Sequence, residues 1–286
     1  AFLSALSEKT PEPFTPGNRR LDLARAIVNP ENPLTRRVIV NWVWQHHFGK
    51  GLVPTSDDFG TRGDPPSHPE LLDHLATQFL ENGWSLKKLH RRIMLSQAYQ
   101  QDSAENPDAR EIDPRNQLLW RMPVRRLEME AMRDALLAVS GELQTSEGGK
   151  PFEEKNGKTI PHRSVYAFLN RDVISPMVAT FDGADPSACT VKRQETMVPQ
   201  QTLFALNSDY VQDRATALVN LPDIAQSKTN ETRITVIYRR IYSRSPDPEE
   251  IKTALQFLGE AEPQSKDPWI QLVHVLLAAN EFHFID

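Results

Sequence analysis

Residues 41–60 have the sequence NWVWQHHFGKGLVPTSDDFG, which places tryptophan, histidine and aspartate side chains beside three glycines. Polar groups next to bulky apolar ones lose hydration, so they either act on a ligand or are satisfied by internal hydrogen bonds. An asparagine–proline pair and a glycine are typical helix start and end signals, which predicts a helix over 33–48. Its apolar residues lie on every side, as in a buried central helix. Glycines and prolines then predict an irregular loop over 49–66.

Helix signals recur on both sides of this stretch. One alternating run, at 165–169, predicts a strand within a segment of weak pattern. The predicted fold class is all-α, an irregular multi-helix bundle with long loops and at most a short strand pair. Capping residues, prolines in first turns and apolar spacings of three and four predict helices at 18–27, 67–83, 85–98, 124–140, 199–207, 209–219, 231–243, 247–258 and 267–277.

The predicted domain organisation is simple. The proline-rich residues 1–16 are expected to be a linker that leads into the domain. Residues 17–286 are expected to be a single helical domain, with an irregular insertion at about 142–195 where glycine pairs interrupt the helical pattern. The first residues have no signal-peptide pattern, and we expect the sequence to begin inside a larger protein.

Composition excludes several classes of protein. The chain is 39% hydrophobic and 25% charged, as in a soluble globular protein, and no apolar run approaches the roughly 18 residues that span a bilayer. The absence of such a run predicts no membrane span. With a formal net charge of -5 no basic face can be assumed, so we expect no nucleic-acid partner. Arginine pairs at 36–37, 91–92, 125–126 and 239–240 lie within helical patterns, which favours salt-bridged helix faces.

Cys189 is the only cysteine of the chain. A single cysteine excludes an internal disulfide, a cysteine-rich zinc site and a haem attached through a Cys-x-x-Cys-His motif. Lys192 and Arg193 would favour the thiolate, but no histidine is found at the spacing of a nucleophile's base, which favours a buried and inert thiol. We expect neither a metal nor a cofactor in this chain.

The candidate catalytic residues lie in the quoted stretch and just after it: His46, His47, Asp57, Asp58 and His68. Adjacent histidines on a helix point about 100° apart, so they cannot bind one metal from one face. A loop that folds back could still bring one or two histidines to a carboxylate, which would form a metal site or an acid–base pair. The alternative is that the histidines bond carbonyls at the helix end and the aspartates cap loop amides.

The candidate binding residues combine aromatic rings with arginines. Aromatic faces stack on sugar rings, and guanidinium groups bind sulfate or carboxylate, so such a set favours an anionic glycan. The alternative is that the rings belong to the core. We expect the functional surface to gather the loop 41–70 and the segment 181–207. The candidate residues are Arg36, Arg37, Trp42, Trp44, Phe59, Arg62 and Arg193.

Long blocks of the sequence resemble a known family. In order along the chain they are similar to the planctomycete-type family catalogued as domain of unknown function 1553, and the likeness covers about residues 17–286. Besides the quoted stretch, the blocks are NPLTRR at 32–37, RGDPPSHPELL at 62–72, GWSLKKLH at 83–90, RRLE at 125–128, FDG at 181–183, PQQTL at 199–203 and NEF at 280–282.

This resemblance implies a place within a larger protein. Members of the family usually form the C-terminal part of large exported proteins with a cytochrome-c-like domain upstream. The resemblance therefore implies that haem c is bound by a separate upstream domain, that the upstream domains of the same polypeptide are partners, and that the location is periplasmic or at the cell surface. The family's association with polysaccharide-degrading bacteria implies polysaccharide as a further partner and a role in polysaccharide utilisation.

Three functions fit these observations. The first is an extracytoplasmic binding or docking module, not itself an enzyme, for an anionic glycan or for the neighbouring cytochrome-c-like domain. The second is a metal- or carboxylate-dependent hydrolase or redox subunit in polysaccharide breakdown, which requires the candidate catalytic side chains to converge in a cleft. The third is a purely structural scaffold, in which every polar group is bonded internally.

Overall fold

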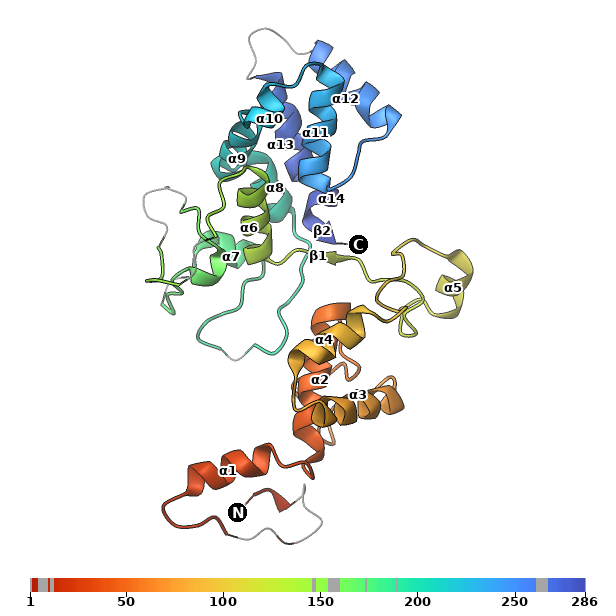
Figure 1. The fold of residues 1–286 in the computed structure, drawn as a ribbon, viewed down its shortest axis with the longest axis vertical. Helices are drawn as coiled ribbons and strands as arrows, with labels where there is room; N and C mark the ends of the chain where they lie inside the picture. Colours follow the sequence, from red (N-terminus) through yellow and green to blue (C-terminus); the bar gives the residue numbers. More distant parts are fainter. Residues whose placement is uncertain are drawn as a thin grey trace. The chain divides into compact units, whose positions relative to one another are not determined.

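The structure is a computed structural model that describes residues 2–4, 10, 13–145, 148–153, 160–172, 174–188, 190–260 and 267–285. The described residues form fourteen α-helices and one two-stranded sheet, so the prediction of an all-α fold is confirmed (Figure 1). The chain divides into two compact units, the N-terminal unit Ala1–Val124 and the C-terminal unit Arg125–Ile285. The single domain over 17–286 stays a prediction, because two compact units can belong to one folding domain or to two.

The N-terminal unit is built around three helices. Helix α2 packs on α3 and α4, and α3 also packs on α4 (Figure 1). Its helices are α1 (Arg19–Ile27), α2 (Pro33–Phe48), α3 (Pro69–Glu81), α4 (Leu86–Met94) and α5 (Pro107–Ile112).

Local signals explain the ends of α2. The side chain of Asn32 accepts a hydrogen bond from the amide of Leu34, and Pro33 occupies the first turn, where its missing N–H costs nothing. At the other end Gly49 adopts a φ of 75°, a left-handed conformation that favours glycine. Helix α2 therefore begins and ends as predicted.

The core of the N-terminal unit comes from α2, α3, α4 and the loop that follows α2. Burial of these apolar side chains, at roughly 25 cal/mol per Å² of apolar surface, is the main force that holds the three helices together. The buried members are Val40, Val43, Trp44, Phe48, Leu52, Val53, Leu72, Leu75, Ala76, Phe79, Leu89 and Ile93.

The C-terminal unit contains the remaining helices. Helix α13 packs on α9, α8 and α12, and α6 packs on α9, so α13 and α9 lie at the centre of this unit. Its elements are β1 (Arg125–Arg126), α6 (Met129–Val139), a 3₁₀ turn (Ser164–Tyr166), α7 (Pro176–Thr180), α8 (Pro199–Asn207), α9 (Asp209–Val219), α10 (Pro222–Ala225), α11 (Asn230–Tyr242), α12 (Pro248–Glu260), α13 (Pro268–Ala278), α14 (Asn280–His283) and β2 (Phe284–Ile285).

The two ends of the C-terminal unit are joined by its short sheet. Strands β1 and β2 pair antiparallel, with Arg125 opposite Ile285 and Arg126 opposite Phe284. The amide of Leu127 also donates to the carbonyl of His283 (2.7 Å). The first and last residues of this unit are thus fixed side by side.

Several local predictions are wrong. The helix predicted over 124–140 begins only at Met129, as α6, and residues 125–126 form strand β1. The helix predicted over 67–83 begins only at Pro69, with His68 as its N-cap residue, and the hydroxyl of Ser67 donates to the carbonyl of Leu52 (3.2 Å). The predicted strand at 165–169 is a 3₁₀ turn followed by an isolated bridge between Ala167 and Phe152.

Two further findings concern the predictions of no membrane span and of a buried cysteine. Among the described residues, no helix combines the length and the apolar character that crossing a bilayer requires. The prediction of a buried, inert thiol at Cys189 lies outside the described residues.

Candidate functional site

The loop after α2 lies against this helix and is held there by buried polar side chains. Asn41 is fully buried; its Nδ2 donates to the carbonyl of Val53 (3.0 Å), and its Oδ1 accepts from the amide of the same residue (2.8 Å). Ser56 accepts from Asn41 Nδ2 (3.2 Å) and donates to Gln45 Oε1. Trp42 Nε1 donates to the carbonyl of Ser56 (3.1 Å). Three side chains of α2 therefore anchor the loop.

A glycine makes this close approach sterically feasible. A Cβ atom added to Gly51 would lie 2.6 Å from the carbonyl oxygen of Val53 and 2.7 Å from Asn41 Nδ2. Separations this short are not tolerated between such atoms, so any larger residue at 51 would push the loop away from α2.

The candidate catalytic side chains lie in different settings. His47 lies against α4, where its Nε2 is 2.8 Å from His90 Nδ1. Asp58 Oδ1 accepts from the amide of Gly60 (2.8 Å), which is the capping role given as the alternative.

His68 is the N-cap residue of α3, and its Nδ1 lies 3.0 Å from Ser67 Oγ. His46 and Asp57 are exposed. Within the described ranges, no group of three histidine, cysteine, aspartate or glutamate side chains is arranged to hold a metal ion. The contacts given for the candidate catalytic side chains therefore do not bring them together at one acid–base centre.

The candidate aromatic residues divide between surface and core. Trp42 is 42% exposed, so part of its ring reaches solvent while its N–H is tied to the loop. Trp44 is 8% exposed and packs on Phe48 with ring centroids 4.3 Å apart. Phe59 is partly buried against the same core. Trp42 is therefore the aromatic residue of this set that is best placed to stack on a sugar.

The candidate arginines of the N-terminal unit also differ in their contacts. Arg36 Nη1 donates to the carbonyl of Pro30 (2.7 Å), and Arg37 Nε bonds Asp73 Oδ1 of α3 (2.6 Å). The hydrogen bond from Arg37 lowers the pKa of Asp73. Arg62 is exposed in the loop. Arg36 and Arg37 thus help to position α2.

In the C-terminal unit, Asp182 joins segments that are far apart in the sequence. Its carboxylate accepts from Arg126 Nη2 of β1 (2.7 Å) and from the amide and hydroxyl of Thr196 (2.9 and 2.7 Å). The Arg126 and Asp182 side chains are 12% and 13% exposed. Burial alone would raise the pKa of Asp182, but the hydrogen bonds from Thr196 and the charge of Arg126 outweigh it and hold the pKa below its ordinary value. Asp182 is therefore ionised.

Arg193 is tied to the same unit by carboxylates. Its Nη1 and Nη2 bond Glu130 Oε2 and Oε1 of α6 (2.6 and 2.8 Å), and Nη1 lies 3.1 Å from Glu128 Oε2. The hydrogen bonds of this fork raise the pKa of Arg193 and lower that of Glu130. Arg193 therefore fastens the segment before α8 to α6.

Two buried nitrogen atoms beside these contacts lack a hydrogen-bond partner among the described residues. They are Arg126 Nη1 and His283 Nε2. Burial lowers the pKa of His283, and the charge of Arg126 acts in the same direction, against a hydrogen bond to the carbonyl of Leu277. The imidazole of His283 is therefore neutral at neutral pH.

The sequence blocks at 125–128 and 181–183 thus meet at one ion pair. The family model named PSD1 and described as "Protein of unknown function (DUF1553)" matches residues 19–258. The chain belongs to this family. This match confirms the resemblance to domain of unknown function 1553 over residues 19–258. No curated protein and no solved structure matches the chain.

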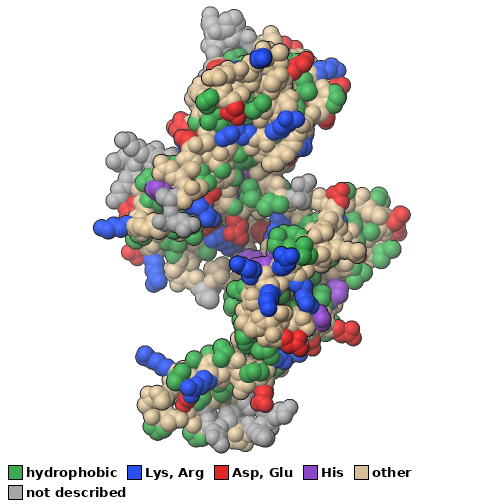
Figure 2. All heavy atoms as spheres, viewed as in Figure 1, with side chains coloured by type: hydrophobic (Ala, Val, Ile, Leu, Met, Phe, Trp, Pro, Cys, Tyr) green, Lys and Arg blue, Asp and Glu red, His purple; other side chains and the backbone are tan. Residues whose placement is uncertain are grey.

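This DUF1553 chain has a further charged surface, on α4, which the sequence analysis did not select. Lys87, Lys88, Arg91 and Arg92 are all exposed, and α4 contains no acidic residue. None of the four forms an ion pair with another described residue, so the described part of the chain gives the predicted salt-bridged face at 91–92 no support. Figure 2 shows Lys and Arg side chains gathered over α4.

The geometry of α4 places these cations together. Residues at spacings of three and four share one face of a helix, which groups 87, 88, 91 and 92. Leu89 and Ile93 point the other way, into the core. A usable signal was present in the sequence, because four cations and no acid within nine residues of an amphipathic helix favour an anionic partner.

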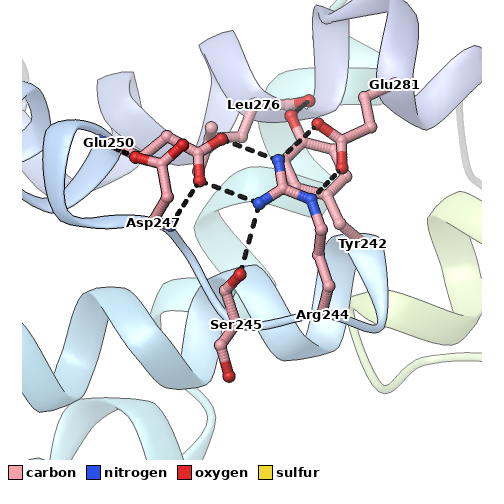
Figure 3. Close-up of polar contacts among 7 residues, drawn as sticks. All are labelled: Tyr242, Arg244, Ser245, Asp247, Glu250, Leu276 and Glu281. Atoms are coloured by element: carbon pink, nitrogen blue, oxygen red, sulfur yellow. Dashed lines mark hydrogen bonds and ion pairs between the residues drawn. The ribbon is translucent and has the colours of Figure 1, made fainter.

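Another charged cluster, in the C-terminal unit, pairs one arginine with two glutamates. Arg244 bonds Glu250 of α12 through Nη1 and Nη2 (2.8 and 2.6 Å) and Glu281 of α14 through Nε and Nη2 (2.5 and 2.8 Å). The guanidinium lies between the two carboxylates in Figure 3. These bonds raise the pKa of Arg244 and lower that of Glu250. Arg244 therefore links the start of α12 to α14 and has a structural role.

Proposed function

We propose that this chain is a binding module for an anionic glycan. The contact surface is the α4 basic face, defined as Lys87, Lys88, Arg91 and Arg92. The single observation that carries the proposal is that all four cations are exposed on one helix without a carboxylate partner among the described residues. Four like charges on adjacent turns repel one another, and a bound polyanion relieves that repulsion.

The charge of the α4 basic face is local. Residues 1–124 carry as many basic as acidic side chains, and the whole chain has a net charge of -5. A nucleic-acid duplex carries one charge about every 1.7 Å and favours a broad basic surface. A helix of nine residues is about 13 Å long. A polymer with sparser charges, such as a sulfated or carboxylated glycan, fits a basic surface of this size better.

Apolar and aromatic groups in the same unit support a sugar ligand. Leu95, directly after α4, is 61% exposed, and Met94 is 45% exposed. Trp42 offers a partly exposed ring, and indole faces stack on the C–H surface of sugar rings. The stacking role of Trp42 is therefore kept as part of the proposal.

The resemblance supports a setting for this binding module. We propose an exported protein, in the periplasm or at the cell surface, in which upstream domains supply the haem c and this chain holds the polysaccharide. Docking to a cytochrome-c-like domain is the competing use of the same basic face.

A binding measurement tests the proposal. Isothermal titration of the chain with dextran sulfate is expected to give saturable binding that weakens as salt is added, while neutral dextran gives none. The triple variant K87Q/K88Q/R91Q should bind dextran sulfate at least about tenfold more weakly.

The matched control changes net charge equally at exposed positions of the C-terminal unit. K150Q/K228Q/K252Q should keep the wild-type affinity within about twofold, because these lysines lie outside the α4 basic face. Equal losses in both triple variants would contradict the proposal, since net charge alone would then govern binding. Absence of binding by the wild-type chain would contradict it as well.

A further inference from the structure

Arg92 differs from the other cations of the α4 basic face because neutral side chains hold it in place. Its Nη1 lies 3.1 Å from His74 Nε2, and its Nη2 donates to Gln78 Oε1 (2.9 Å). Arginine can only donate, so His74 Nε2 is the acceptor and the ring proton lies on Nδ1. Both partners belong to α3, which packs on α4.

A third residue fixes the orientation of the amide. Gln78 Nε2 donates to Glu81 Oε2 (2.7 Å), so the amide nitrogen faces Glu81 and the amide oxygen faces Arg92. The three residues of α3, at 74, 78 and 81, follow the spacing of one helix face. Together they form a chain of hydrogen bonds that ends on the guanidinium of Arg92.

These contacts orient Arg92 without cancelling its charge. A guanidinium has five N–H groups in a planar fork, and two of them are used by His74 and Gln78. Arg193 and Arg244, by contrast, place their forks on carboxylates. Arg92 is exposed, so its remaining N–H groups can meet an external oxyanion.

We infer that Arg92 is the specificity-determining residue of the α4 basic face, with a pre-oriented fork that binds one sulfate or carboxylate group of the glycan through two parallel hydrogen bonds. Gln78 and His74 are positioning residues, since they act through Arg92. Lys87, Lys88 and Arg91 supply attraction without fixed geometry. This inference rests on the proposed function, because it assigns roles within the same surface.

Two charge-conserving substitutions test the inference. R92K keeps the charge but loses the fork, because an ammonium group binds as a point charge. R91K makes the same change at the neighbouring residue, whose side chain has no hydrogen-bond or ion-pair partner within the described part of the chain. In titrations with dextran sulfate, R92K should lower the affinity about tenfold and R91K less than about twofold.

A third variant tests the positioning role. Q78L removes the acceptor of Arg92 without changing any charge. The affinity should fall about threefold while the salt dependence of binding stays the same, because the number of ionic contacts is unchanged. A fall in the salt dependence would show that Gln78 acts otherwise, and it would overturn the positioning role.

The outcomes separate the inference from the proposed function. If K87Q/K88Q/R91Q loses binding but R92K and R91K bind equally well, the α4 basic face stands and the special role of Arg92 is overturned. If K87Q/K88Q/R91Q binds as the wild type does, the proposed function itself fails. A parallel titration with polygalacturonate identifies the oxyanion: a tenfold loss in R92K with either polymer supports the inference and names sulfate or carboxylate as the group bound.

Discussion

The arginines of the C-terminal unit and the cations of α4 illustrate two uses of positive charge in one chain. Arg126, Arg193 and Arg244 each bond carboxylates at 2.5–2.8 Å, and each joins segments that are distant in sequence. The cations of α4 form no such pairs among the described residues and join nothing except α3 to α4 through Arg92. A charge that holds a fold is matched inside the fold, whereas an exposed and unmatched group is available to a ligand.

The uncharged hydrogen-bond network of Asn41, Gln45 and Ser56 in the N-terminal unit resembles these paired arginines, because its polar groups are also satisfied within the fold. Asn41, Gln45 and Ser56 satisfy one another and the loop backbone, so their polar groups are used to fix the loop to α2. In the stretch that looks most like an active site in the sequence, these polar contacts therefore serve to hold the loop against α2. Four variants test this distinction.

Loss of the buried ion pair between Arg126 and Asp182 should have the largest effect on stability. Asp182→Ala leaves the guanidinium of Arg126 12% exposed and without its carboxylate, which is expected to lower the free energy of unfolding by about 3–5 kcal/mol. Urea denaturation measures the change. D57A, at an exposed aspartate, should change stability by less than about 0.5 kcal/mol. If D182A lowers the free energy of unfolding no more than D57A does, the Arg126–Asp182 pair contributes no more to stability than an exposed charge.

Loss of the neutral hydrogen bonds between Asn41 and the loop after α2 should have the second largest effect on stability. Asn41→Ala leaves the buried amide of Val53 without its acceptor and leaves the carbonyl of Val53 with only the longer contact to Ser56 Oγ (3.4 Å), at an expected cost of about 2–3 kcal/mol in the free energy of unfolding. Thermal or urea unfolding measures it. N207A, which removes one exposed hydrogen bond to the carbonyl of Leu203, should cost less than about 1 kcal/mol. Equal costs would mean that the loop is not held by Asn41.

A smaller and pH-dependent effect is expected at Arg244. R244Q should lower the free energy of unfolding by about 1 kcal/mol at pH 7, because its ion pairs are partly exposed and screened by solvent. Arg244 holds the pKa of Glu250 below its ordinary 4.5, so this stability is present above that pH and is lost as pH falls through the lowered pKa.

The difference between wild type and R244Q should therefore shrink as pH falls from about 5 to about 3. Urea denaturation over this range measures it. A difference that is constant across the range would show that the pairing of Arg244 with Glu250 contributes nothing to stability.

The smallest effect on stability should come from α4. K87Q/K88Q/R91Q is expected to change the free energy of unfolding by less than about 0.5 kcal/mol, with the sign favouring the variant, because like charges on adjacent turns are removed. Urea denaturation of this variant beside the wild type checks it. A clear loss of stability would show that these cations have partners in the fold, and the contrast with the C-terminal unit would disappear.

Local signals in the sequence were sufficient to predict most helices. Asparagine, serine or aspartate caps and first-turn prolines gave α2, α4 and α13 their starts, because those effects act within one turn. The strand nature of Arg125 and Arg126 could not be predicted, since it depends on pairing with residues 284–285 at the far end of the chain. The ion pair of Arg126 with Asp182 was hidden for the same reason.

The candidate site was also predictable only in part. That the loop after Gly49 lies on α2 was anticipated, and the capping role of Asp58 was given as an alternative. The burial of Trp44 depends on how α2 packs with α3 and α4, which the helical pattern alone did not resolve. The basic run at 87–92 was readable, but whether its charges are matched depends on acidic residues elsewhere in the fold.

The most direct test of the account is an amine footprint of the bound chain. Lysines are acetylated in the presence and absence of dextran sulfate, and each site is quantified by mass spectrometry. The account predicts that the polymer protects Lys87 and Lys88, whereas Lys252, which is paired with Glu249 at 3.3 Å in the C-terminal unit, reacts at the same rate in both samples. Equal modification of Lys87 and Lys88 with and without the polymer would contradict the claim that the unmatched cations of α4 form the binding surface.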